Sequence, residues 1–264
     1  MNGLEYPLPD AVASAGVLGW RKTEERVRRY LVEFAKENGL TEAVRYCHVA
    51  TGDAADRISK LARELDADVI VTSTHGHTGW MRVFLGSTAE RIVRYARCPV
   101  LIARERRNVP AAPISLRKIL APVDFSRKSA TGLAYAVRLA AAFGASVTLL
   151  HVPPPDRYPT AGGMVVDPDP DLTARARAVA AERMRTLIGE TDFGGVEHAT
   201  AVRVGNVEDE ICRFAKKNGF DLIVTSSHGR TGLRHAVLGS VAEHIVRYAE
   251  GPVLVVPTRW RAKT

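Results

Sequence analysis

Short apolar runs alternate along the chain with longer segments whose apolar residues recur at helical spacing. The run Ile119–Val123 predicts a buried strand, and the segment from about 127 to 143 predicts an amphipathic helix that stops at Gly144. The alternation continues to the C-terminus, with strands expected at about 146–152, 198–204, 221–226 and 253–257, and helices at about 172–188, after Asn206 and after Gly239. This order predicts an α/β fold in which helices cover both faces of a parallel sheet.

The same pattern occurs twice. Residues 49–103 align with 202–256 without a gap, and about half of the aligned pairs are identical. Both copies contain an apolar run followed by a Ser-His-Gly or Thr-His-Gly segment, then Leu-Gly-Ser, and finally Pro-Val-Leu. Agreement of this length indicates the duplication of a whole domain, since solenoid repeats have much shorter periods.

The first copy begins late. Its first clear element is a helix from about Thr23 to Asn38, which precedes Gly39 and matches the helix at 172–188. Nothing upstream matches the first two strands, the helix between them, or Asp124. We therefore predict an incomplete domain without strands 1 and 2 at 1–107, a linker at 108–115 and a complete domain at 116–264. Two explanations stay open: a true start upstream of Met1, or a damaged domain docked on the second copy.

Composition narrows the class of protein. The net charge of +8 is spread over segments that also carry acidic residues, so it predicts solvated surface with a bias toward anionic ligands and no specific nucleic acid. Small basic clusters occur only at 104–107 and 259–263. Cys47, Cys98 and Cys212 lie far apart and are expected to be reduced thiols. No stretch has the length of a membrane helix and no signal peptide is evident, so we expect a cytoplasmic protein.

Polar residues and glycines follow two strands of the second copy. Asp124 comes after the first strand, and Ser226 to Gly229 come after the fourth. Ligands of doubly wound sheets bind at these carboxyl ends. Gly239 and Ser240 open the next helix, whose N–H groups and dipole favour anions. Together they predict a phosphate cradle, with Asp124 placed to bind a sugar hydroxyl, a base or a metal.

Simpler interpretations exist for the same residues. The glycines can serve turns alone, and Ser240 can be an N-cap that forms a capping box with Glu243. His75 and His228 have no paired carboxylate or cysteine in sequence, which favours a structural role over acid–base chemistry. The chain has no Walker A motif, no catalytic triad order and no metal-ligand spacing, so we predict neither catalytic residues nor metal ligands.

The second copy resembles the universal stress protein family in its Ala-Pro-Val-Asp-Phe-Ser opening and its Ser-His-Gly-Arg-Thr-Gly, Leu-Gly-Ser-Val-Ala-Glu and Pro-Val-Leu-Val-Val segments. The resemblance implies a doubly wound, five-stranded parallel sheet of order 3-2-1-4-5, flavodoxin-like or adenine nucleotide alpha hydrolase-like. The ATP-binding branch of that family carries G-x2-G-x9-G-[ST]. Here a serine replaces the first glycine. The nucleotide-binding residues implied are Asp124, Val152, Ser226, Gly229, Gly239, Ser240 and Val241, and the first copy keeps a vestigial cradle of Ser73, Gly76, Gly86 and Ser87.

Three functions remain open at this point. The leading hypothesis is a stress-related regulatory protein that binds ATP, alone or with Mg²⁺, through the second copy without strong catalysis. The second is an interaction module that binds no nucleotide and self-associates through the last strand of each copy. The third is hydrolysis of ATP or of another phosphate ester.

Overall fold

The structure, a computed structural model, describes residues 17–73, 86–104, 115–153, 170–229 and 238–261. The chain divides into two compact units, Met1–Asp53 and Ala54–Thr264. The first described unit consists of helix α1, Val17–Glu37, and a short 3-10 helix, η1, Thr41–Tyr46. Gly39 turns the chain with a φ of 73° after α1, as a stop residue should.

Residues 45–49 of this first unit match a strand of the second copy but form no strand themselves. In the second copy the matching strand, His198–Val202, pairs with the strand Ser146–His151, and no described residue of the first copy corresponds to that neighbour. Without a partner strand the segment's backbone groups would stay unpaired. Arg45 and Tyr46 belong instead to η1, and residues 47–49 form neither helix nor strand.

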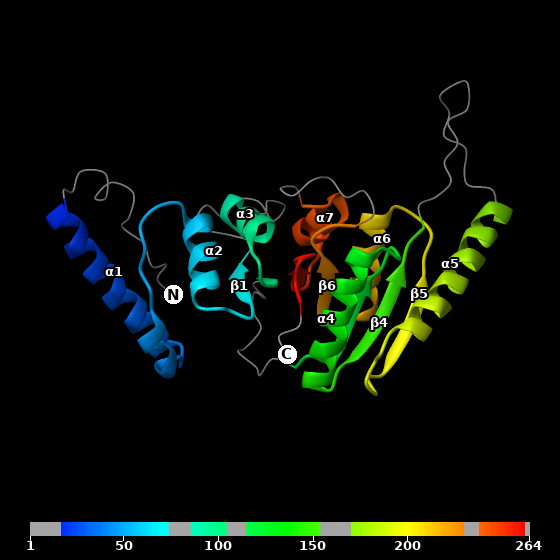
Figure 1. The fold of residues 1–264 in the computed structure, drawn as a ribbon, viewed down its shortest axis with the longest axis horizontal. Coiled ribbons are helices and arrows are strands. Elements are labelled where there is room, and N and C mark those ends of the chain that lie inside the picture. Colours follow the sequence, from blue (N-terminus) through cyan, green and yellow to red (C-terminus); the bar gives the residue numbers. More distant parts are fainter. Residues whose placement is uncertain (1–16, 74–85, 105–114, 154–169, 230–237, 262–264) are drawn as a thin grey trace, which may run out of the picture. The chain divides into compact units, whose positions relative to one another are not determined.

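The second unit contains one seven-stranded sheet of order β1-β2-β7-β6-β3-β4-β5 (Figure 1). All neighbouring strands are parallel except β2 and β7. The strands are β1, Ile70–Ser73; β2, Val100–Ala103; β3, Lys118–Pro122; β4, Ser146–His151; β5, His198–Val202; β6, Leu222–Ser226; and β7, Val253–Val256. Within the second copy the order β5-β4-β3-β6-β7 is the predicted 3-2-1-4-5, so the fold class is confirmed.

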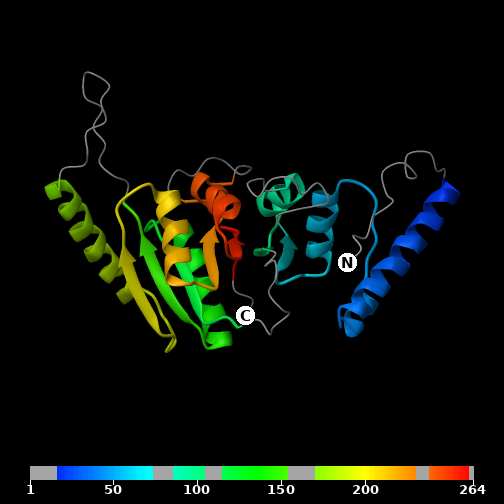
Figure 2. The same ribbon diagram turned by 180° about the vertical axis from the view of Figure 1, so that it is seen from behind.

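Helices cover both faces of this sheet (Figures 1 and 2). On one face α4, Arg127–Phe143, and α5, Pro170–Glu190, share a core with alternate residues of the strands. The other face is covered by α2, Ala54–Glu64; α3, Ser87–Tyr95; α6, Val207–Asn218; and α7, Ser240–Tyr248. The second core draws on both copies, since residues of α2 and α3 belong to the same cluster as residues of α6 and α7.

Most predicted boundaries agree with these elements, because capping residues mark them, as at the end of α4 and the start of α6. Gly144 ends α4 in the left-handed region, and the Asn206 side chain accepts a hydrogen bond from Asp209 N at 3.0 Å to cap α6. Two boundaries were wrong: α1 begins at Val17 and not at about Thr23, and α5 continues through Gly189 to Glu190. The helix ends where Thr191 Oγ1 donates to the carbonyl oxygen of Leu187 at 2.6 Å.

The two copies join through their last strands. Strand β2 runs antiparallel to β7, with Val100 opposite Val255 and Ile102 opposite Val253. Among the described residues, the first copy contributes β1 and β2 to the sheet, and β1 forms one edge. In this structure the pairing of last strands is therefore a contact within one chain.

Candidate functional site

A cavity of about 320 Å³ lies at the carboxyl ends of β3, β4 and β6 in the second copy. This edge of the sheet is where the strand order reverses, because β4 lies on one side of β3 and β6 on the other. All seven predicted nucleotide-binding residues line the cavity: Asp124, Val152, Ser226, Gly229, Gly239, Ser240 and Val241. The structure thus brings together residues that lie more than a hundred positions apart in the sequence.

Asp124 follows β3 and is held in place by its own loop. Its Oδ1 accepts a hydrogen bond from Ser126 N at 2.9 Å, while Ser126 caps α4 by accepting from Ser129 N at 3.1 Å. Phe125, between them, adopts a φ of 62°, a conformation that is uncommon for a bulky residue. The sharp turn directs the Asp124 carboxylate to the cavity rim.

Gly229 lies against this carboxylate. A Cβ atom at position 229 would be 2.7 Å from Asp124 Oδ2, a distance at which the carboxylate would have to move. A side chain at this position would displace the carboxylate, because the loop after β6 passes so close to the loop after β3. The two loops therefore lie close together where they line the cavity.

The start of α7 forms the predicted anion cradle. Ser240, Val241 and Ala242, the first three residues of the helix, all line the cavity. Their N–H groups have no partner within the helix by geometry, and the positive end of the helix dipole adds to their attraction for an anion. The loop is fixed by a hydrogen bond from Gly239 N to the carbonyl oxygen of Ser227 at 2.9 Å.

The capping-box interpretation was wrong. The N-cap of α7 is Gly239, which has no side chain, so Ser240 is already the first helical residue. Glu243 instead accepts a hydrogen bond from Arg247 Nη2 at 2.9 Å, one turn further along the helix. The N-cap of α3 is likewise Gly86, and Glu90 pairs with Arg94 at 2.7 Å. Neither helix uses a side chain to cap its first N–H groups.

Ser226 stands where the ATP-binding pattern has its first glycine. Its side chain is buried and its Oγ donates to the carbonyl oxygen of His228 at 2.8 Å. The hydroxyl is thereby bonded within the loop. His228 does not line the cavity, and its Nδ1 lies 3.0 Å from Ser227 Oγ, which agrees with a structural role for the imidazole.

Several other lining residues were missed by sequence reasoning, and His151 and Ile211 are two of them. His151 ends β4, is 9% exposed, and its Nδ1 lies 2.7 Å from the carbonyl oxygen of Val123. Ile211 reaches the cavity from α6 and is 2% exposed. The position of His151 at the carboxyl end of a strand was a usable signal, whereas Ile211 depends on how α6 packs.

The vestigial cradle of the first copy is partly described. Ser73 ends β1, Gly86 precedes α3, and Ser87 begins that helix. Gly86 has φ and ψ of −57° and 138°, close to the −62° and 144° of Gly239. Gly76 and His75 lie outside the described residues. The backbone geometry is therefore repeated, without counterparts of Asp124 and Val152.

Two further features bear on function. Among the described residues, no group of three or more His, Cys, Asp or Glu side chains could hold a metal ion. No helix in the described part of the chain has the length and apolar character to cross a membrane.

These features define a doubly wound α/β protein with a glycine-bordered cavity at its topological switch point. The sequence model of the Universal stress protein family matches residues 5–104 and again 115–257, so the chain belongs to that family. Universal stress protein Rv2623 of Mycobacterium tuberculosis is 27% identical over 260 residues, which are 96% of this chain and 81% of that protein. Universal stress protein MJ0577 of Methanocaldococcus jannaschii is 28% identical over 155 residues, 54% of this chain and 96% of its own length.

A solved structure supports the fold along nearly the whole chain. A universal stress protein from Archaeoglobus fulgidus superimposes with a TM-score of 0.66 at 22% identity, covering 94% of this chain and 83% of that one. Tandem copies of the family fold are therefore confirmed by both sequence and structure.

Proposed function

We propose that the second copy binds an adenine nucleotide, with ATP as the leading candidate. We further propose that the protein acts as a cytoplasmic regulator in a stress response. The observation that supports this most directly is the convergence of the seven predicted residues on one cavity. The volume of about 320 Å³ lies within the range of small-ligand sites.

Each wall of the cavity suits a different part of the nucleotide. The N–H groups at the start of α7 would bind the phosphates, because they combine free donors with the positive end of the dipole. Asp124, across the cavity, would accept hydrogen bonds from the ribose hydroxyls. Val152, 5% exposed after β4, offers an apolar surface for the adenine ring.

The lining favours binding over catalysis. Asp124 is the one carboxylate among the described lining residues, so a Mg²⁺ ion would take its ligands mainly from phosphates and water. His151 is buried against the Val123 carbonyl oxygen and tilted over Phe125, with ring centroids 4.3 Å apart. Neither residue belongs to a nucleophile–base pair in the described site.

Calorimetric titration with ATP, with and without Mg²⁺, tests the proposal. Gly239→Val should abolish binding, because the valine methyl groups would fill the cradle while the backbone, with a φ of −62°, accepts the substitution. A Cβ at this position would meet its nearest neighbours at 3.4 Å, an ordinary contact, so folding should survive. Gly86→Val is the matched control in the first copy and should leave ATP binding unchanged.

Absence of wild-type binding at millimolar ATP would refute the nucleotide proposal. The chain would then be better explained as an interaction module of the same fold, a function favoured by the antiparallel pairing of β2 with β7. ATP turnover that survives purification and falls in Asp124→Ala would instead indicate an enzyme.

A further inference from the structure

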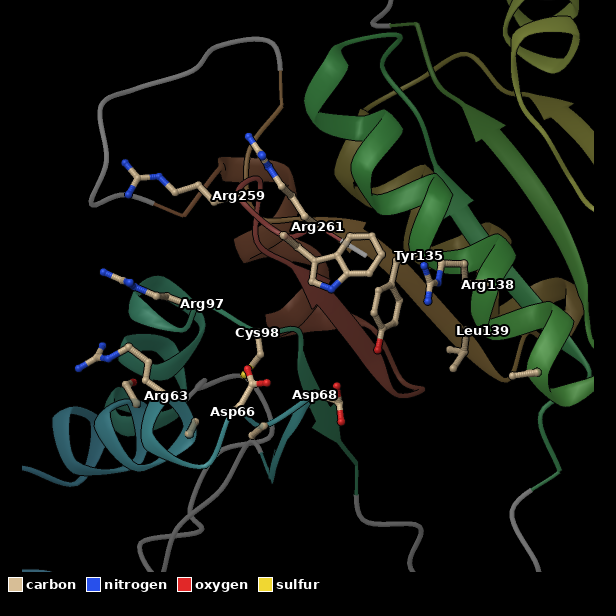
Figure 3. Close-up of a pocket in the computed structure, with 15 residues that line it drawn as sticks. Arg63, Asp66, Asp68, Arg97, Cys98, Tyr135, Arg138, Leu139, Arg259 and Arg261 are labelled. Atoms are coloured by element: carbon tan, nitrogen blue, oxygen red, sulfur yellow. The ribbon is translucent and has the colours of Figure 1, made fainter. Parts of the chain in front are cut away.

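A second and larger cavity, of about 510 Å³, lies where the two copies meet. It is lined by residues that precede β1 and β2, by residues of α4 and by the segment that follows β7 (Figure 3). Because β2 runs antiparallel to β7, residues entering the first-copy strands come close to residues leaving the last strand. The cavity shares no lining residue with the nucleotide site.

Arginine dominates this cavity. Five arginines line it against two aspartates, Asp66 and Asp68. Arg63, Arg97 and Arg259 extend their side chains in the same direction in Figure 3, from three different segments of the chain. The other two are Arg138 and Arg261. Arginine guanidinium groups are a usual means by which proteins bind phosphates.

The repeat shows that this charge is particular to the first copy. Arg63 and Arg97 correspond to Lys216 and Glu250, which form an ion pair of 2.6 Å in the second copy. In the first copy an arginine replaces the glutamate, and neither guanidinium group forms an ion pair or hydrogen bond with a described residue. The substitution turns a neutralised pair into two positive charges at the same place in the fold.

An aromatic wall adjoins these arginines. The Trp260 ring meets Tyr135 edge to face with centroids 4.9 Å apart, and the Arg138 guanidinium lies 5.9 Å from the Trp260 ring centroid. This packing holds Trp260 at the cavity, between Arg259 and Arg261. Trp260 can therefore report on whatever binds beside those arginines.

A buried hydroxyl also lines the cavity. Ser59 of α2 is 4% exposed, and its Oγ has no hydrogen-bond partner among the described residues. A buried polar atom without a partner costs free energy, which a ligand that accepts or donates a hydrogen bond would recover. This observation is independent of the arginines and indicates the same site.

We propose that this cavity is a second ligand site, which binds a small molecule bearing two or more linked phosphate groups. The phosphates would lie among Arg63, Arg97 and Arg259, with the rest of the molecule toward Trp260. The inference does not depend on ATP binding at the other cavity.

Inorganic pyrophosphate is the probe for this site. The titration uses the full chain with Trp20→Phe and Trp80→Phe, so that Trp260 alone emits, and with Gly239→Val to block the first cavity. Trp260 emission should change and saturate at submillimolar pyrophosphate. Arg97→Glu should weaken binding at least about tenfold, the effect of losing a charge-assisted contact and pairing Arg63 internally. The variant restores the residue of the second copy, so its fold should tolerate it.

The matched control is Arg177→Glu, which makes the same charge change on the exposed surface of α5. It should change pyrophosphate affinity less than twofold. The proposal fails if pyrophosphate leaves Trp260 emission unchanged up to millimolar concentration, or if Arg177→Glu weakens binding as much as Arg97→Glu. The second result would mean that only overall charge attracts the anion.

Discussion

The repeat offers a matched test of how the covering of a strand affects stability. Val224 in β6 and Val71 in β1 are equivalent residues at the same strand position. Val224 is 1% exposed and packs in the core beneath α4, whereas Val71 is 61% exposed. No described residue of the first copy corresponds to α4. Replacing each valine with threonine keeps the β-branched shape and strand propensity, and exchanges one methyl group for a hydroxyl.

The two substitutions should differ sharply in stability. Burying an unpaired hydroxyl at position 224 should cost about 2 kcal/mol, within the range measured in protein interiors. With a urea dependence of about 2 kcal/mol/M, this lowers the unfolding midpoint by about 1 M. Val71→Thr should change stability by less than about 0.5 kcal/mol, as expected for an exposed surface residue. Equilibrium urea unfolding followed by circular dichroism measures both.

The reasoning would be refuted by equal losses in the two variants. Such a result would mean that β1 has a covered face in solution, through another segment or another molecule. A small loss for Val224→Thr alone would show that the space beneath α4 can hydrate or rearrange.

Three other predictions concern single contacts. Gly229→Ala should weaken ATP binding about tenfold in calorimetry. The new Cβ would lie 2.7 Å from Asp124 Oδ2, so the carboxylate must move. Unchanged affinity would show that the carboxylate has no part in binding. Asn206→Ala should lower stability by about 1 kcal/mol in urea, since it removes the 3.0 Å cap on Asp209 N. Burial raises the pKa of Cys212 from 9.0 to about 11. Its protonated thiol therefore favours the folded state below pH 9, and that stability is lost as pH rises toward 11. Unfolding at several pH values should show this loss in the wild type and not in Cys212→Ala.

The fold of the second copy could be predicted because local signals agree with tertiary packing. Gly144 and Asn206 mark helix ends by backbone conformation and hydrogen bonding, which operate within a few residues. Gly189 gave a false signal, since a glycine ends a helix only where the chain leaves helical geometry, and here that occurs at Thr191. Local sequence does not determine at which of two nearby residues a helix ends, because that depends on tertiary packing.

The lining of the cavity that we assign to a nucleotide could likewise be predicted from the sequence, because its residues lie at strand ends and at the start of one helix. Such positions follow from topology alone, as Asp124 and Gly239 show. The close approach of the loop after β6 to Asp124 could not be predicted. The distance of 2.7 Å between a Cβ at position 229 and Asp124 Oδ2 depends on how the two loops pack. The cavity of about 510 Å³ lined by five arginines was harder to predict. Arg97 and Arg259 line one cavity only because the two copies join through antiparallel strands.

That joining also explains what the retained part of the first copy does for the second. Without β2, strand β7 would be an open edge with unpaired backbone groups, a known template for unwanted association. Arg104, which follows β2, donates from Nη2 to the carbonyl oxygen of Val246 in α7 at 2.5 Å, and burial lowers the pKa of its guanidinium. The core on that face then runs without a break from α2 and α3 to α6 and α7. Since α7 begins at the proposed phosphate cradle, the first copy supports the helix on which nucleotide binding would depend.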